Sequence, residues 1–172
     1  MKSFVKMENK TEEIILQRGE IINKFINIEW IINAIISQWY ISKVEKEFVL
    51  EVLYDEYFSF SLKRRIIEKI FSERAPSNLR PKLKFMLDSL NRLNSIRNYF
   101  AHCTESMTLS NIDGEYIPDP KNHNKHLDFQ ELYNEFMAKE KEVNKYFYDL
   151  FISIGGKATF DEKKKANKID TY

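Results

Sequence analysis

The scarcity of helix-breaking residues is the feature that most constrains this fold. The chain has 172 residues but only four glycines and four prolines. These two residue types most often interrupt helices and form the turns of β-structure, so the composition favours long helices over a many-turned sheet. Apolar residues make up 43% of the chain and charged residues 31%, which is ordinary for a protein that buries its own core. We therefore expect an all-α protein.

Apolar residues recur at intervals of three and four, the spacing of one face of an amphipathic helix. Capping residues support the helix ends: Thr11 stands before the first helix and Ser59 or Ser61 before the third. Asp128, followed three residues later by Glu131, forms the capping-box pattern of the last helix. The predicted helices span residues 11–40, 44–57, 62–72, 81–100 and 128–155.

A segment of different character precedes the last helix. Residues 103–127 contain Asp113-Gly114 between short alternating runs, which is typical of a two-residue hairpin turn. We expect a small β-hairpin or loop insertion here. The predicted architecture is an antiparallel bundle of four or five helices. It forms a single domain over residues 1–155, including the insertion at 103–127, and a flexible tail follows at 156–172.

Several features that are missing from the sequence limit the kind of protein it can be and the compartment in which we expect it. Cys103 is the only cysteine, so neither an intramolecular disulfide nor a cysteine-rich zinc site can form, and a lone thiol fits a reducing compartment. The N-terminus shows no apolar signal-peptide run, and no stretch reaches the roughly 18 consecutive apolar residues of a membrane span. His123 and His126 have no cysteine beside them. We expect a cytoplasmic protein without a metal ion or other cofactor.

Charge is unevenly distributed along the chain. The net charge is +1, which does not imply a large nucleic-acid-binding surface overall. Residues 63–84, however, hold eight lysines and arginines against Glu68 and Glu73. Two interpretations stay open, a solvated helix face and a patch that follows a phosphate backbone. On the second interpretation, the candidate RNA-binding residues are Lys63, Arg64, Arg65, Arg80 and Lys82.

The run LNSIRNYFAHC, residues 93–103, places Arg97, Asn98 and His102 among apolar neighbours. Buried polar groups without partners cost several kcal/mol, so these side chains are either satisfied inside the fold or face a cleft. Asn98 and His102 are four residues apart and share one helix face. Arg97 lies about 140° around the helix from His102, a gap that its long side chain can cross.

These residue types suit cleavage of RNA without a metal. An imidazole takes or gives a proton near neutral pH, and a guanidinium binds a phosphate and stabilises the charge of a transition state. RNA supplies its own nucleophile, the 2′-hydroxyl beside each phosphate. Asn98 could orient the imidazole or donate to the phosphate. The alternative is structural: His102 as a core or interface histidine, and Arg97 as the ion-pair partner of Glu29.

The run IRNYFAH at the end of an apolar helix, in a small all-α chain, resembles the HEPN (higher eukaryotes and prokaryotes nucleotide-binding) superfamily. The HEPN signature is an arginine, then usually asparagine, histidine or aspartate, and then a histidine four to six positions after the arginine. Arg97, Asn98 and His102 match it, and Ala101 is also common before the histidine. The first helix resembles HEPN N-terminal helices that often carry an acid, here Glu29. The resemblance spans residues 11–155.

The resemblance implies a metal-independent endoribonuclease with Arg97, Asn98 and His102 as catalytic residues and Glu29 in support. Members typically dimerise so that two motifs share one cleft, and they leave a 2′,3′-cyclic phosphate. Many are toxins or act in abortive-infection and other antiviral defence. The branch paired with nucleotidyltransferase antitoxins has a tyrosine two residues after the histidine, where this chain has Thr104, so the regulatory partner stays unidentified. The alternative is a non-catalytic HEPN-like module that binds nucleotide or RNA or mediates dimerisation.

Overall fold

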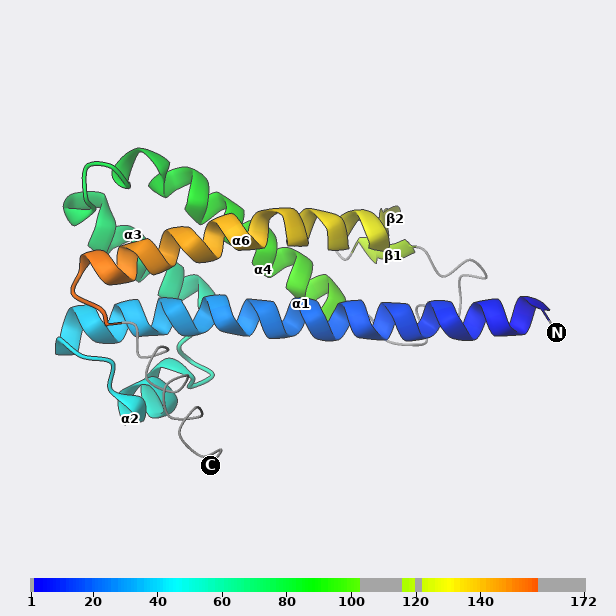
Figure 1. The fold of residues 1–172 in the computed structure, drawn as a ribbon, viewed down its shortest axis with the longest axis horizontal. Coiled ribbons are helices and arrows are strands. Elements are labelled where there is room, and N and C mark those ends of the chain that lie inside the picture. Colours follow the sequence, from blue (N-terminus) through cyan, green and yellow to red (C-terminus); the bar gives the residue numbers. More distant parts are fainter. Residues whose placement is uncertain (1, 103–115, 120–121, 158–172) are drawn as a thin grey trace, which may run out of the picture. The chain divides into compact units, whose positions relative to one another are not determined.

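The computed structural model describes residues 2–102, 116–119 and 122–157. Helices dominate them, and the predicted all-α fold class is confirmed. The elements follow one another along the chain as coloured in Figure 1. In order they are α1 (Lys2–Ile41), α2 (Lys46–Phe48), the π-helical η1 (Val49–Leu53), α3 (Phe60–Arg74), the 3-10 turn η2 (Arg80–Lys82), α4 (Leu83–His102), β1 (Tyr116–Asp119), β2 (Asn122–Asp128) and α6 (Phe129–Ser153).

Two predicted helix boundaries are wrong for identifiable reasons. α1 begins at Lys2 rather than at Thr11, because no glycine or proline precedes Thr11 to stop the helix. The second predicted helix, 44–57, is shorter and ends at Leu53. There the Asp55 carboxylate accepts a hydrogen bond from the Tyr57 amide at 2.9 Å, a local turn that competes with helix.

Two predicted helix caps, Ser59 and Asp128, are confirmed by hydrogen bonds to backbone amides within the next turn. Ser59 caps α3, since its hydroxyl accepts a hydrogen bond from the Leu62 amide at 3.3 Å. Asp128 caps α6 by accepting from the Glu131 amide at 2.8 Å. At the other end of α6, Gly155 adopts a φ of 86°, and the Gly156 amide donates to the Phe151 carbonyl at 3.0 Å. Glycine is the residue that most often ends a helix in this way, because it adopts a positive φ without strain.

Internal contacts divide the chain into two compact units. Unit 1 comprises Met1–Glu29 and Lys84–Lys145, and unit 2 comprises Trp30–Leu83 and Tyr146–Tyr172. Consequently α1 and α6 contribute to both units, whereas all of α4 except Leu83 belongs to unit 1. No helix in the described part of the chain combines the length and the apolar character needed to cross a bilayer.

Unit 1 consists of the first part of α1, α4, the hairpin and the first part of α6. Arg18 on α1 reaches Ala101 near the end of α4, whereas Phe25, farther along α1, contacts the earlier residue Arg97, so these helices are antiparallel. Arg92 of α4 contacts Glu135 of α6, whereas Phe100, later in α4, contacts the earlier residue Phe129. Within unit 1, α4 and α6 are therefore antiparallel, and the first part of α1 runs parallel to the first part of α6. The buried apolar residues are Ile21, Phe25, Ile28, Met86, Leu87, Leu90, Leu93, Ile96, Phe100, Phe129, Leu132, Phe136 and Val143.

The predicted insertion contains an antiparallel pair of strands, β1 and β2. Tyr116 pairs with Asp128 and Pro118 with His126, and the register shifts between Pro118 and Asp119. The strands lie C-terminal to the predicted Asp113-Gly114 turn, which is outside the described residues. Cys103, Thr104 and the predicted tail beyond residue 157 are also outside them.

Unit 2 combines the end of α1 with α2, η1, α3, η2 and the end of α6. Ser37 holds the connection after α1, since its hydroxyl donates to the Lys43 carbonyl at 2.8 Å and accepts from the Glu45 amide at 3.1 Å. The buried apolar residues of this unit are Ile32, Ala34, Ile35, Ile36, Val49, Leu53, Ile67, Ile70, Phe71, Ala75, Leu83, Tyr146, Phe147, Leu150 and Phe151.

Candidate functional site

The last two turns of α4 carry the motif, and Arg97 is its anchored member. The Arg97 side chain is half-buried, and its Nη1 donates a hydrogen bond to the Asn98 Oδ1 at 2.9 Å. The guanidinium carbon lies 5.6 Å from the centre of the Phe25 ring on α1, a cation–π distance. Arg97 Nε is buried and has no hydrogen-bond partner among the described residues. One charged group is thus held in place from two sides.

Asn98 and His102 share one face of α4. They are separated by about 6 Å along the helix axis, and Asn98 is half-buried whereas His102 is exposed. In the described structure, no hydrogen bond joins His102 to Arg97 or Asn98. An exposed imidazole can approach a polymeric substrate, and the guanidinium of Arg97, five residues earlier on the same helix, belongs to a type of group that binds phosphate. The arrangement can therefore combine phosphate binding with proton transfer.

The turn that carries His102 is fixed by contacts from two other helical segments. Arg18 on α1 donates from Nη2 to the Ala101 carbonyl at 3.0 Å. The Phe100 ring meets the Phe129 ring of α6 at 4.2 Å between centres in a T-shaped arrangement. The backbone of the motif is therefore anchored although the His102 side chain is exposed.

Glu29, the predicted supporting acid, lies on α1 one turn beyond Phe25 and is half-buried. Arg97 Nη1 donates a hydrogen bond to Asn98. The role of Glu29 as a partner of Arg97 stays a prediction. Glu29 and the motif residues all belong to unit 1.

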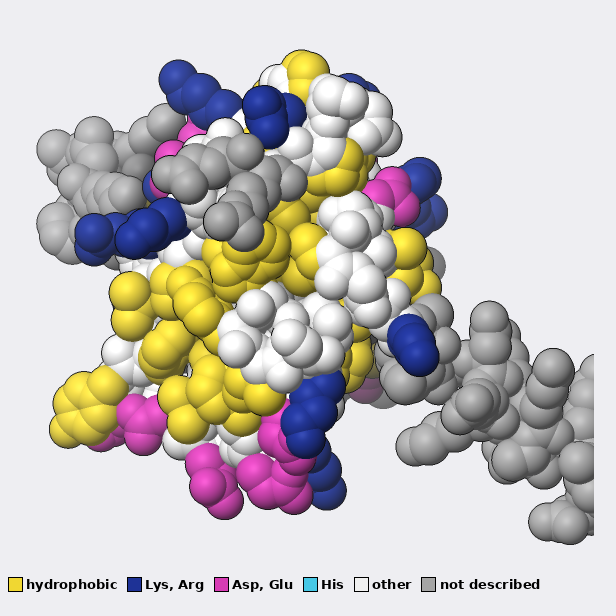
Figure 2. Space-filling model, turned by 90° about the vertical axis from the view of Figure 1, so that its left-hand side faces the viewer, with side chains coloured by type: hydrophobic (Ala, Val, Ile, Leu, Met, Phe, Trp, Pro, Cys, Tyr) yellow, Lys and Arg dark blue, Asp and Glu magenta, His cyan; other side chains and the backbone are white. Residues whose placement is uncertain are grey.

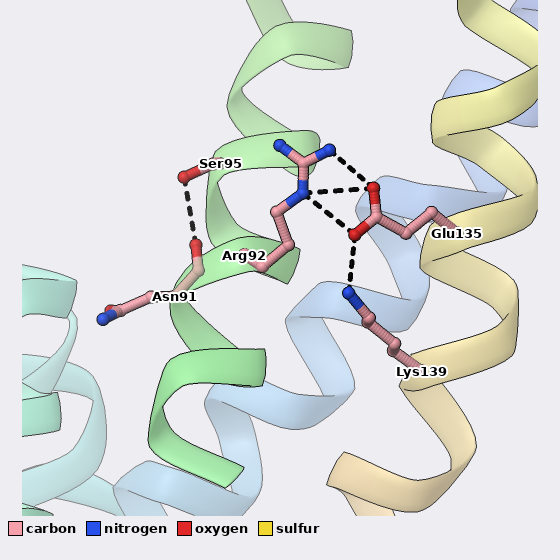
Figure 3. Close-up of polar contacts among 5 residues, drawn as sticks. All are labelled: Asn91, Arg92, Ser95, Glu135 and Lys139. Carbon is pink, nitrogen blue, oxygen red and sulfur yellow. Dashed lines mark hydrogen bonds and ion pairs between the residues drawn. The ribbon is translucent and has the colours of Figure 1, made fainter. Parts of the chain in front are cut away.

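A charged cluster links α4 to α6 before the motif (Figure 3). Arg92 Nε donates to both carboxylate oxygens of Glu135, at 3.0 and 3.1 Å, and Lys139 Nζ donates to Glu135 Oε1 at 2.6 Å. The hydrogen bond from Arg92, with the second from Lys139, lowers the pKa of Glu135 to about 2. Farther round α4, the Ser95 hydroxyl donates to the Asn91 carbonyl at 3.0 Å. The cluster fixes α4 against α6 within unit 1.

Lys63 is wrong as a candidate RNA-binding residue. Its side chain is buried, with only 2% of the residue exposed, and its Nζ lies 5.0 Å from the centre of the Tyr54 ring. The physical reason is visible in the sequence, because Lys63 precedes the buried Ile67 and Ile70 by four and seven residues. This spacing puts it on the inward face of α3.

The other basic candidates are reachable from solvent to different degrees. Arg64 is half-buried and forms an ion pair with Glu68 at 3.4 Å. Arg65 and Lys82 are exposed, and so is Arg80, whose Nη2 donates to a backbone carbonyl. All of them belong to unit 2, whereas the motif belongs to unit 1.

The described residues contain no cluster of side chains suited to bind a metal ion. His123 and His126 lie on strand β2. Among the residues that the structure describes, no group of three or more histidine, cysteine, aspartate or glutamate side chains is placed so that it could hold a metal ion.

Hydrophobic side chains gather on one face of the molecule (Figure 2). Such a gathering is typical of an interaction surface. Helical periodicity does not predict it, because the spacing of apolar residues does not show which of them stay exposed. The large apolar residues that unit 2 exposes are Trp30, Tyr40, Ile41, Val44, Leu50, Val52, Tyr54, Tyr57, Leu62, Tyr148 and Ile152.

Sequence reasoning missed the residues that anchor the motif. Arg18 precedes Ala101 by 83 positions, and Arg92 precedes Glu135 by 43, so no local pattern could connect them. Comparison with known protein families, with curated proteins and with solved structures finds no match to this chain. The functional interpretation therefore depends on the chemistry of the site and on the motif itself.

Proposed function

We propose that this protein is a metal-independent endoribonuclease of the HEPN type. The observation that carries the proposal is a guanidinium, that of Arg97, which is held by Asn98 and Phe25 and is followed five residues later on the same helix by the exposed imidazole of His102. Arg97 binds the scissile phosphate, His102 transfers protons, and Asn98 positions Arg97. The order and spacing of these residues match the HEPN signature.

The reaction needs only groups that the chain and RNA supply. An imidazole accepts the proton of the 2′-hydroxyl, and the 2′-oxygen attacks the adjacent phosphorus and forms a new P–O2′ bond. The P–O5′ bond breaks, and the departing 5′-oxygen gains a proton from an imidazolium. The products are a 2′,3′-cyclic phosphate and a 5′-hydroxyl. Arg97 stabilises the negative charge on the phosphorane oxygens.

We propose that two copies of the chain form the functional unit. A single His102 would have to serve as base and then as acid, whereas two facing motifs supply one imidazole for each role. His102 is exposed at the end of α4, where it can meet the same residue of a second copy. The HEPN resemblance further supports a role as a toxin or in antiviral defence, exerted through cleavage of RNA in the cytoplasm.

The second candidate is a non-catalytic helical module that binds nucleotide or RNA or mediates dimerisation. It is favoured by the burial of Arg97 Nε and by the hydrogen bond that Arg97 already makes to Asn98. An arginine engaged in this way can serve the fold alone. Cleavage activity separates the two candidates.

The test is cleavage of an end-labelled RNA by the purified protein in the presence of EDTA. We expect products that end in a 2′,3′-cyclic phosphate and no cleavage of DNA, which lacks the 2′-hydroxyl. Arg97→Ala and His102→Ala should each abolish cleavage. Asp88→Asn, a change at an exposed position on the same helix, is the matched control and should cleave as the wild type does. Cleavage that survives in both motif variants would reject the assignment.

A further inference from the structure

Arg18 contacts the motif helix from outside the motif. It lies on α1 and is half-buried, and its Nη2 donates to the carbonyl of Ala101 at 3.0 Å. Ala101 directly precedes His102, the last residue of α4. The hydrogen bond therefore ends on the peptide group that joins Ala101 to His102.

A cation at this place stabilises the end of a helix. The last four carbonyls of an α-helix have no partner within it and carry the negative end of the helix dipole. The carbonyl of Ala101 is one of them, and a guanidinium both satisfies it and opposes the dipole. Without such a partner, the last turn of a helix frays readily.

The contact of Arg18 is one half of a reciprocal pair between α1 and α4. An arginine of α1, Arg18, binds the backbone of α4, while an arginine of α4, Arg97, lies over Phe25 of α1. Arg18 and Phe25 are seven residues apart and therefore share one face of α1. Arg97 and Ala101 are one turn apart on α4. The two contacts fix the register of α1 against α4 along the turn that carries the motif.

We propose that Arg18 is a positioning residue of the site, which holds the last turn of α4 so that the His102 imidazole keeps its place relative to Arg97 and Asn98. This inference rests on the proposed ribonuclease function. His102 is exposed, so its placement depends on the backbone to which it is attached. Arg18 acts through that backbone and is a different residue from the three of the HEPN signature.

The test compares the full-length wild type with Arg18→Met, Arg18→Lys and Tyr133→Phe. Methionine keeps the length of the apolar stem and removes the donors, whereas lysine keeps a charged donor. Tyr133→Phe is the matched control, because it deletes a 2.7 Å hydrogen bond between α6 and Glu20 of α1 without touching α4. Hydrogen exchange of the peptide that covers residues 98–102 reports on the turn, and kcat and KM report on the site.

We expect Arg18→Met to speed exchange in the last turn of α4 and to lower kcat about tenfold to a hundredfold, as small displacements of catalytic groups do. KM should stay within about twofold of the wild-type value, because Arg97 remains in place. Arg18→Lys should restore most of kcat and of the exchange protection. Tyr133→Phe should change neither quantity.

Three results would overturn the inference: unchanged exchange in Arg18→Met, a loosened turn with full kcat, and a rise in KM alone, which would make Arg18 a substrate-binding residue. A failure of the proposed function looks different. In that case the wild type cleaves no RNA, while the exchange measurement still decides whether Arg18 holds the turn.

Discussion

Arg97 donates a hydrogen bond to the side chain of its own neighbour in the chain, Asn98, with 2.9 Å between Nη1 and Oδ1. Successive residues of a helix point about 100° apart, so the Arg97 side chain must bend toward the face of Asn98 to make this bond. That face also carries His102, four residues later. The hydrogen bond thus holds the Arg97 guanidinium against a side chain on the helix face that carries His102.

Replacing Asn98 should impair catalysis more than folding. Asn98→Ala removes the acceptor that positions the Arg97 guanidinium, and a small displacement of a group that binds the reacting phosphate can cost about a hundredfold in rate. We therefore expect kcat/KM for RNA cleavage to fall about tenfold to a hundredfold, while the thermal unfolding midpoint shifts little because Asn98 is only half-buried.

Asn98→Asp provides the comparison for this experiment. It keeps an acceptor for Arg97 but places a negative charge next to the phosphate, so KM should rise while Arg97 stays in place. Full activity in Asn98→Ala would show that Asn98 does not position Arg97.

Mixing wild-type protein with His102→Ala protein tests the shared cleft. If each cleft uses the imidazoles of two copies, a mixed dimer is inactive, and the specific activity follows the square of the wild-type fraction after exchange of subunits. Independent sites would give activity proportional to that fraction. Sedimentation at micromolar concentration gives the oligomeric state, and a fully active monomer contradicts the dimer proposal.

The Glu135 cluster predicts a loss of stability in acid. The pKa of Glu135 is about 2 in the folded protein, against an ordinary value of 4.5. As pH falls below about 4.5, the unfolded chain binds the proton first. The stabilising contribution is therefore complete above that pH and is lost as pH falls toward about 2.

Glu135→Gln removes this pH dependence and should cost about 1 kcal/mol of unfolding free energy at pH 7, the range of a partly exposed ion-pair network. Urea unfolding at pH 7, 4 and 3 measures it. Glu68→Gln, which breaks the exposed pair with Arg64 within α3, is the matched control and should cost less than about 0.5 kcal/mol. Equal costs for the two variants would mean that the link between helices adds nothing.

The burial of Tyr146 leads us to expect a loss of folding stability in alkali. Its hydroxyl donates to the Leu79 carbonyl at 2.9 Å, and burial raises the pKa of Tyr146 to about 12. The unfolded chain ionises first, near pH 10, so this contribution to stability is present below pH 10 and is lost as pH rises through about 12.

Tyr146→Phe should cost about 1 kcal/mol at pH 7, the value of one hydrogen bond, and should weaken the alkaline loss of stability. Unfolding in urea at pH 7, 9 and 10.5 measures both effects. The exposed Tyr148, two residues later, supplies the control Tyr148→Phe, for which neither effect is expected. An alkaline loss that is the same in Tyr146→Phe as in the wild type would assign it to other tyrosines.

Features governed by local chemistry could be predicted from the sequence. The caps at Ser59 and Asp128 and the stop at Gly155 depend on residues within one turn of one another. The start of α1 could not be predicted in this way. Thr11 is a suitable capping residue, but it can equally lie inside a helix, and α1 continues through it from Lys2. The inward position of Lys63 follows from its spacing of four residues from the buried Ile67, whereas the local excess of positive charge says nothing about which of these side chains face inward.

In the candidate site, too, residues that are close in the sequence could be predicted, whereas contacts between distant helices could not. The proposed motif residues stand within six positions of one another, from Arg97 to His102, so helical spacing alone places them on one helix. Their supports, Arg18, Phe25 and Phe129, come from α1 and α6, and only the folded chain brings them to α4. Helical spacing shows which residues share a face but not which face of another helix they meet.

The borders between the two units fall within helices, between Glu29 and Trp30 in α1, between Leu83 and Lys84 in α4 and between Lys145 and Tyr146 in α6. Each unit is therefore made of segments that are distant in the chain, and neither has all its parts until α6 has left the ribosome. Emerging nascent chains would expose half-finished cores through most of synthesis. For the same reason, the gene has no natural point at which one unit could be excised and expressed without the other.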